Sequence, residues 1–195
     1  VARHLHGLGY RLSLGARDPA KLAEAVADLG DDVLQWRYDA EDRPTAAAWV
    51  AATAERFGKI DALVNNAGVL RSFPYDQPDE AQLDEMWAVN VKAPYFLSLA
   101  ALPHLRETGQ GRIVNILSNS GLRYAGGVPG YAMSKFAATA LTHVLRYGAW
   151  EDGVRVCGLC PGAVDTDMSK TNAPFPGEKT DPNTLAVIVA MALSL

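Results

Sequence analysis

The chain has 195 residues, of which 49% are apolar and 21% are charged, and its formal net charge is −4. This composition is typical of a globular protein with a hydrophobic core, and it excludes intrinsic disorder, which requires low hydrophobicity and high net charge. The mildly acidic balance argues against a nucleic-acid partner, and no apolar stretch approaches the roughly 20 residues that a membrane-spanning helix needs.

Apolar, β-rich runs alternate with helical patterns along the whole chain. The predicted strands are Arg11–Gly15, Val33–Tyr38, Ala62–Asn65, Arg112–Ser118 and Val154–Cys160. The predicted helices are Ala20–Leu29, Pro44–Phe57, Glu80–Leu105 (interrupted by Pro94 and Pro103) and Tyr131–Trp150. This alternation predicts an α/β fold of one domain over residues 1–195, with a doubly wound parallel sheet in a three-layer α/β/α arrangement.

The two ends of the sequence have the patterns of interrupted elements. Val1–Tyr10 resembles the last turns of a helix that Gly9 closes, and Leu185–Leu195 is an apolar helix without a terminator. We therefore expect the fold to be incomplete at both ends and the chain to be a fragment of a longer domain.

Polar or small residues follow every predicted strand. Because ligands of such sheets bind beyond the carboxyl ends of the strands, these positions are the candidate binding residues. They are Arg17, Asp39, Asn65-Asn66-Ala67-Gly68, Ser118 and Pro161-Gly162.

The strongest chemical signal is Tyr131-Ala-Met-Ser-Lys135 at the start of a predicted helix, with Ser118 thirteen residues earlier at a strand end. Residues four apart on a helix share a face, so the phenol and the ammonium can lie side by side. An ammonium and a helix N-terminus both lower the pKa of a phenol, which makes Tyr131 a candidate general acid/base that Ser118 assists. Taken alone, this short pattern fits a surface Tyr and Lys on an amphipathic helix better.

Four motifs follow one another in order: NNAG at 65–68, IVNILS ending at Ser118, YAMSK at 131–135 and VRVCGLCPG at 154–162. This set resembles the classical short-chain dehydrogenases/reductases, the SDR family, over essentially all 195 residues. The resemblance implies a Rossmann-like fold. It also implies an oxidoreductase that interconverts a small-molecule carbonyl and an alcohol by hydride transfer from or to a nicotinamide cofactor.

The resemblance assigns catalytic roles to four positions. Tyr131 is similar to the family's acid/base, and Lys135 to the residue that holds the nicotinamide ribose and lowers the tyrosine pKa. Ser118 would orient and polarise the substrate carbonyl. Asn90 matches the asparagine that anchors a water of the proton relay, although the residue alone is explained better as a solvated polar position.

Further positions resemble the cofactor-binding segments of the family. Those expected near the nicotinamide end are Asn66, Ala67, Gly68, Pro161, Gly162 and Thr166, together with Tyr131 and Lys135.

Two positions bear on the adenosine end of the cofactor. Ala16 stands where NAD-binding relatives carry an acidic residue, and Arg17 follows it, which favours NADP(H) over NAD(H). The alternative is that Arg17 caps a turn before a helix that Asp18 starts. Asp39 resembles the family's aspartate beside the adenine ring, but a helix N-cap would look much the same.

The glycine-rich fingerprint of the family and the strand that carries it are absent from this sequence, as is the family's closing strand. Without that central strand, the edges of the Arg11–Gly15 and Ala62–Asn65 strands should face a gap, where unpaired backbone groups are costly.

Other functions and partners remain open at this point. A non-catalytic NADP-binding sensor or interaction module of the same fold is the alternative to an enzyme, and an inactive fragment is a further one. The family commonly forms homodimers or homotetramers through the long helices, which the resemblance extends to Glu80–Leu105 and Tyr131–Trp150. Two cysteines are too few for a disulfide framework and fit the reducing cytoplasm.

Two further features of the sequence are the spacing of its cysteines and the two segments expected to line the substrate pocket. Cys157 and Cys160 have the spacing of a redox or metal motif, but three residues along a strand place them about 10 Å apart on opposite faces, so we expect neither a disulfide nor a metal site. Residues 119–130 and 163–181 would line the substrate pocket, and Leu122, Tyr124 and Phe175 suggest that its walls are partly apolar.

Overall fold

A computed structural model of the chain describes residues 1–124, 128–171 and 177–195. Its strands are β1 (Leu12–Ala16), β2 (Val33–Arg37), β3 (Ala62–Asn65), β4 (Arg112–Ile116) and β5 (Arg155–Leu159). Its helices are α1 (Ala2–Gly7), α2 (Pro19–Val26), α3 (Arg43–Phe57), α4 (Glu80–Trp87), α5 (Ala93–Glu107), α6 (Pro129–Ala149), α7 (Asp167–Thr171) and α8 (Pro182–Ser194). None of these described helices has the length and apolar character needed to cross a membrane.

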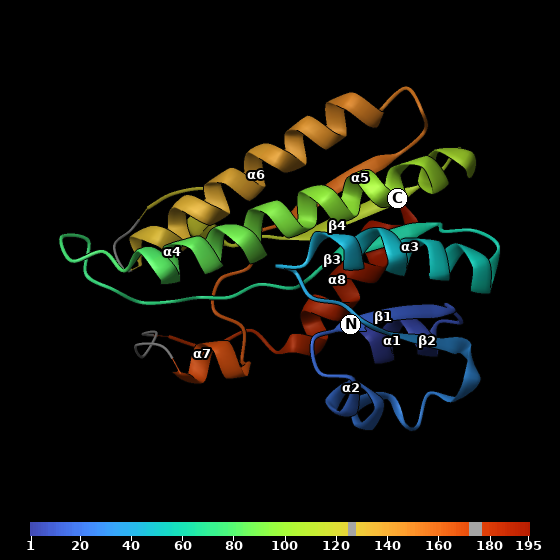
Figure 1. Cartoon of the computed structure of the whole chain (residues 1–195), viewed down its shortest axis with the longest axis horizontal. Coiled ribbons are helices and arrows are strands. Elements are labelled where there is room, and N and C mark those ends of the chain that lie inside the picture. Colours follow the sequence, from blue (N-terminus) through green and yellow to red (C-terminus); the bar gives the residue numbers. More distant parts are fainter. Residues whose placement is uncertain (125–127, 172–176) are drawn as a thin grey trace.

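The strands pair in two groups, β1 with β2 and β3 with β4 and β5, and every pair is parallel. Along β4, Ile113 and Val114 are both completely buried, and they point to opposite faces because side chains alternate along a strand. Ile113 packs with Leu105 of α5 and Leu141 of α6, whereas Val114 packs with Val189 of α8. The predicted α/β fold with helices on both faces of a parallel sheet is therefore confirmed (Figure 1).

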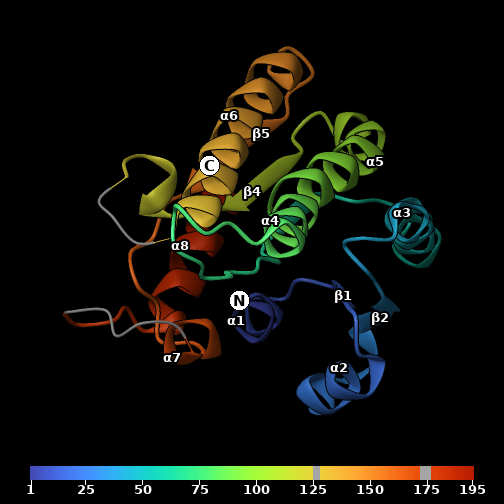
Figure 2. The same ribbon diagram turned by 60° about the vertical axis from the view of Figure 1, so that its left-hand side comes forward.

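The predicted gap between two strand edges is also present. The described strands β1 and β3 are not hydrogen-bonded to each other. A cavity of about 990 Å³ lies between them, lined by residues 12–15 on one side and 62–67 on the other. In Figure 2, β1, β2 and α2 lie apart from the part of the chain that contains β4, β5 and α6.

The predicted helix Glu80–Leu105 is interrupted near one of the two prolines at which a break was predicted. A π-helical turn, Ala88–Lys92, separates α4 from α5. Pro94 follows it, and its ring lacks an N–H and would clash with the carbonyl of Asn90, so the widened turn accommodates it. The prediction that Pro103 also interrupts the helix is wrong, because α5 continues through Pro103 to Glu107.

Candidate active site

Ser118 lies just beyond the end of β4, in extended backbone, and its side chain is buried. The residues on either side of Ser118 continue the pairing of β4 with β5 and the chain that follows β5. Leu117 donates to the Leu159 carbonyl at 2.8 Å, and Asn119 donates to the Pro161 carbonyl at 2.9 Å. The Ser118 Oγ accepts a hydrogen bond from the backbone N–H of Ser120 at 3.1 Å. The sheet and a short 3₁₀ turn therefore fix the direction of this hydroxyl.

Tyr131 and Lys135 lie one turn apart near the start of α6, which Pro129 begins. The Lys135 Nζ is 5.6 Å from the centre of the Tyr131 ring, and it donates a hydrogen bond to the Ile116 carbonyl at 3.0 Å. Lys135 is only 5% exposed. The structure thus brings a phenol and a buried amine to the end of the strand that leads to Ser118.

The pKa shifts in this cluster have a different cause from the one expected. Burial raises the pKa of Tyr131, and the Ser118 hydroxyl, which hydrogen-bonds the phenol, lowers it by less. The sequence predicted that Lys135 would lower that pKa. Instead, burial lowers the pKa of Lys135 itself to about 8, because a charged amine loses solvation in the interior.

Asn90 is buried within the π-helical turn, and its amide links two elements. Its Oδ1 accepts from the backbone N–H of Val69, and its Nδ2 donates to the Val69 carbonyl, both at 2.9 Å. The Nδ2 also donates to the Ser134 Oγ at 3.0 Å, and that hydroxyl donates to the Tyr131 carbonyl at 2.8 Å. Asn90 therefore connects the loop after β3 to the first turns of α6.

The loop Asn66–Gly68 after β3 crosses directly over this cluster. A Cβ on Gly68 would lie 3.4 Å from the Asn90 Oδ1 and 3.7 Å from the Lys135 Nζ. Asn66 and Ala67 are exposed beside it. Because Gly68 has no side chain, another group can approach the backbone closely beside the buried Lys135 amine, which fits a hydroxylated cofactor such as a nicotinamide dinucleotide.

The segment after β5 lies beside Ser118 as well. A Cβ on Gly162 would lie 3.9 Å from the Asn119 Nδ2, and Pro161 accepts the hydrogen bond from Asn119 described above. Thr166 is exposed at the start of α7, where its hydroxyl contacts the Val164 carbonyl at 3.4 Å. In the expected substrate walls, residues 125–127 and 172–176, with Phe175, lie outside the described residues.

Arg17 and Asp39 are not part of this cluster. They follow β1 and β2, on the other side of the large cavity, and Arg17 is exposed. The Asp39 Oδ1 accepts from the backbone N–H of Glu41 at 3.1 Å, in a turn. The alternative that Asp39 caps a helix is wrong, because Asp42 is the N-cap of α3.

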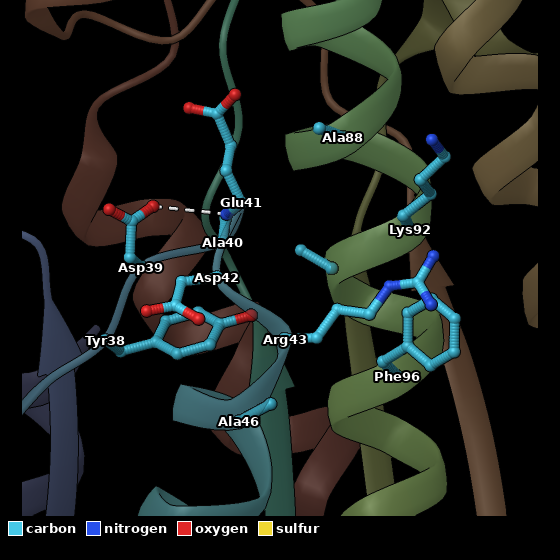
Figure 3. Close-up of a pocket in the computed structure, with 11 residues that line it drawn as sticks. Tyr38, Asp39, Ala40, Glu41, Asp42, Arg43, Ala46, Ala88, Lys92 and Phe96 are labelled. Carbon is cyan, nitrogen blue, oxygen red and sulfur yellow. Dashed lines mark hydrogen bonds between the residues drawn. The ribbon is translucent and has the colours of Figure 1, made fainter.

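Asp39 also borders a cavity of about 210 Å³ between this turn and the π-helical region. In Figure 3 the Arg43 side chain reaches the Phe96 ring, while the Asp39 carboxylate lies on the opposite side of the cavity. The Arg43 guanidinium carbon is 4.3 Å from the centre of that ring. Ser118, Tyr131, Lys135 and Asn90 do not line this cavity.

Comparison with known proteins identifies the family. A family model described as short chain dehydrogenase matches residues 1–176. The chain belongs to the short-chain dehydrogenase family. Agropine synthesis reductase of Rhizobium rhizogenes is 40% identical over 195 residues, which are 99% of this chain and 45% of that protein. The short-chain dehydrogenase chain thus spans less than half the length of this relative.

A second relative and two solved structures extend the comparison. The 2-(R)-hydroxypropyl-CoM dehydrogenase of Xanthobacter autotrophicus is 38% identical over 148 residues, 72% of this chain and 57% of that protein. The 3-ketoacyl-(acyl-carrier-protein) reductase of Brucella melitensis, complexed with NADH, superimposes with a TM-score of 0.92 at 26% identity, covering 97% of this chain and 83% of its own. An alcohol dehydrogenase of Thermococcus sibiricus, complexed with 5-hydroxy-NADP, gives 0.89 at 30% identity, covering 100% and 84%.

Sequence reasoning missed two residues that the dehydrogenase places in the cluster. Ser134 links Asn90 to Tyr131, although it lies 44 positions from Asn90 in the sequence. The Cys160 thiol accepts from the backbone N–H of Ser118 and has an electrostatic interaction with Lys135. Cys157 and Cys160 are both free thiols. No long-range signal in a single sequence identifies such contacts.

Proposed function

We propose that this short-chain dehydrogenase is an oxidoreductase that interconverts a carbonyl and an alcohol with NADP(H), over one domain of residues 1–195. The observation that carries the proposal is the convergence of Ser118, Tyr131 and Lys135 at the end of β4. A hydroxyl, a phenol and a buried amine meet there beside an open backbone segment, Asn66–Gly68.

The proton is transferred by Tyr131. In the reducing direction, NADPH would supply the hydride to the carbonyl carbon when bound. Ser118 donates a hydrogen bond to the carbonyl oxygen, and the Tyr131 hydroxyl gives its proton to the same oxygen, which becomes the alcohol. Burial of Tyr131 and Ser118 excludes water from the oxygen and strengthens both interactions.

Lys135 and Asn90 would return the proton to the phenolate. With a pKa of about 8, the Lys135 amine gains and loses protons near neutral pH. The Asn90 carbonyl lies four residues before Pro94, which has no N–H to bond it, so this carbonyl is suited to accept from a relay water. The Asn90 side chain is already engaged with Val69 and Ser134.

The remaining predicted residues would bind the cofactor. Lys135 and the loop Asn66–Gly68 would hold the nicotinamide ribose, and Pro161, Gly162 and Thr166 would meet the carboxamide. Arg17 would bind a 2′-phosphate, which supports NADP(H), and Asp39 would border the adenine. One relative's structure contains an NADP derivative and another contains NADH, so the choice depends on Arg17.

Exposed apolar side chains support the proposed assembly, and the free cysteines support the proposed compartment. Large apolar residues are exposed on α5 and α6, among them Tyr95, Leu99, Met133, Phe136 and Val144. Such a patch supports a homodimer or homotetramer formed through these helices. The two free cysteines suit the reducing cytoplasm.

Replacement of the acid/base tests the proposal. Tyr131→Phe in the full-length protein should lower kcat against a carbonyl panel by about 10³-fold or more, since the proton donor is lost, with the Kd of NADPH unchanged. Tyr147→Phe, at a phenol that is 90% exposed on the same helix, is the matched control and should retain wild-type turnover.

The same assay separates the enzyme from a sensor. A non-catalytic NADP-binding module would bind NADPH in calorimetry, and neither wild type nor Tyr131→Phe would oxidise it. Full turnover by Tyr131→Phe would refute the role of Tyr131.

A further inference from the structure

A buried row of polar side chains runs from the sheet into α6, behind the catalytic cluster. Asn65 and Asn115 are directly opposite each other on β3 and β4, and the Asn65 Nδ2 donates to the Asn115 Oδ1 at 2.8 Å. The Asn115 Nδ2 donates to the Thr142 Oγ1 at 2.9 Å, and that hydroxyl donates to the Ala138 carbonyl at 2.9 Å. Asn115 is 3% exposed and Thr142 is 2% exposed.

We propose that Thr142 is a positioning residue, whose hydroxyl, through Asn115, sets the position of α6 along β4 at which Tyr131 and Lys135 meet Ser118. The inference rests on the proposed function for its catalytic consequence. It goes beyond the cluster itself, because neither Thr142 nor Asn115 touches the reacting groups.

The first argument is the spacing of the attachments. Lys135 and Thr142 are seven residues apart, which is about two helical turns, so they lie on one face of α6. Lys135 donates to the Ile116 carbonyl, and Thr142 accepts from Asn115, the residue just before Ile116. Two bonds to adjacent positions of β4 restrict both tilting and sliding of α6, whereas one bond leaves a pivot.

The second argument is the cost of breaking the row. A buried amide donor without an acceptor costs about 1–3 kcal/mol, so the state in which Asn115 and Thr142 are bonded is strongly preferred over a shifted helix. A methyl group at the position of the Thr142 hydroxyl cannot accept the Asn115 N–H. Of the two hydrogen bonds that join α6 to β4 through Thr142 and Lys135, only that of Lys135 would remain.

The row also contains its own control. The Asn65 Nδ2 donates to the Ser98 Oγ at 3.1 Å, and Ser98 is completely buried on α5. Ser98→Ala therefore removes a buried hydroxyl of the same row without touching α6. Arg146 attaches α6 to β5 through the Val156 carbonyl at 2.9 Å, so the helix remains docked in either variant.

The test compares Thr142→Val, Thr142→Ser and Ser98→Ala in the full-length protein. We expect Thr142→Val to lower kcat by about 10- to 100-fold, the usual consequence of a misplacement of about 1 Å, with the KM for cofactor within threefold. Thr142→Ser keeps the hydroxyl and should restore kcat. Ser98→Ala should lower the melting temperature as much as Thr142→Val but leave kcat within twofold.

A second readout does not depend on turnover. Titration of the Lys135 amine by NMR should give a pKa near 8 in wild type, Thr142→Ser and Ser98→Ala. In Thr142→Val we expect it to rise by about one unit, because a shifted helix admits water. The titratable groups that interact with Lys135 are the Tyr131 phenol and the Cys160 thiol, and both are present in every variant.

An unchanged Lys135 titration in Thr142→Val, or an equal loss of kcat in Ser98→Ala, would overturn the proposal. If Thr142→Val does not fold, Thr142→Ala is measured in the same way. Wild type without turnover on any carbonyl would remove the proposed function, and the NMR comparison would still decide the position of the helix.

Discussion

The two groups of strands differ in how firmly they hold their candidate functional residues. Around β3, β4 and β5, the side chains of Ser118, Lys135 and Asn90 are buried. Each is hydrogen-bonded to another segment: Ser118 to the Tyr131 phenol, Lys135 to the Ile116 carbonyl, and Asn90 to the backbone of Val69. Around β1 and β2, Arg17 is exposed, and the Asp39 carboxylate accepts from Glu41 in its own turn and pairs with Arg37.

The difference matches the requirements of the two proposed tasks, which are proton transfer and cofactor recognition. Proton transfer requires groups fixed within fractions of an ångström, and the residues proposed to be catalytic lie where packing and hydrogen bonds determine their positions. Attraction of a 2′-phosphate needs mainly a positive charge at the end of a strand, and an exposed arginine can supply it. Substitutions in the two regions test whether they also differ in their effects on stability and turnover.

The largest expected effect is the stability cost of the buried Lys135 amine. Its pKa is about 8 in the folded protein, against 10.5 ordinarily. Between these values the unfolded chain binds more protons than the folded one, so the free energy of unfolding should rise with pH. Relative to Lys135→Met, wild type should gain about 3 kcal/mol at most from pH 7 to pH 10.5.

Denaturant unfolding of both proteins at several pH values checks this. Burial raises the pKa values of Tyr131 and Cys160, so the stability that they contribute falls with rising pH in both proteins. The Tyr131 contribution cancels in the difference, whereas part of the Cys160 contribution remains because Lys135 lowers the pKa of Cys160 in wild type only. A difference that does not vary with pH would mean that Lys135 is solvated, and the contrast between the two regions would lose its energetic basis.

The next effect concerns the contact between the Ser118 turn and α6. A Cβ on Gly121 would lie 2.6 Å from the Lys135 carbonyl and 2.8 Å from the Thr139 Oγ1. Gly121→Ala should therefore lower the free energy of unfolding by about 1–3 kcal/mol and reduce turnover, because the turn moves away from the helix.

Gly148 supplies the matched substitution on α6. A Cβ there would have no atom within 4 Å, so Gly148→Ala should raise stability by about 0.5–1 kcal/mol through helix propensity. Equal stability changes in Gly121→Ala and Gly148→Ala would show that the turn does not pack as tightly as the structure indicates.

The sequence predicted the features that depend on local patterns. The strands, the parallel sheet and most helix starts follow from periodicity and from capping residues such as Asp18, which accepts from Ala20 and Lys21 as a helix N-cap should. The motif spacing also brought Ser118, Tyr131 and Lys135 into consideration together.

Features that depend on distant contacts were not predictable in this way. The pKa of Tyr131 rises because the fold buries it, which no local spacing expresses. The bond between Asn115 and Thr142 joins residues 27 positions apart. The helical pattern of the sequence does not indicate which residue of β4 Thr142 would contact. The π-helical turn at Ala88–Lys92 likewise depends on Pro94 and the buried Asn90 together.

The smallest expected effect is on cofactor choice, in the weakly held region. Arg17→Ala should raise the KM for NADPH by about fivefold, since one exposed charge pair contributes about 1 kcal/mol, and leave the KM for NADH unchanged. Stability should change by less than about 0.5 kcal/mol, because Arg17 is exposed.

Arg37 provides the control for charge alone. It is paired in register with Ala16, beside Arg17, and its guanidinium is 3.8 Å from the Asp39 carboxylate. Arg37→Ala should leave the ratio of the two KM values within twofold, because Asp39 neutralises this cation. If Arg37→Ala weakens NADPH binding as much as Arg17→Ala does, the selectivity comes from the summed positive charge of this edge, and a single side chain does not determine it.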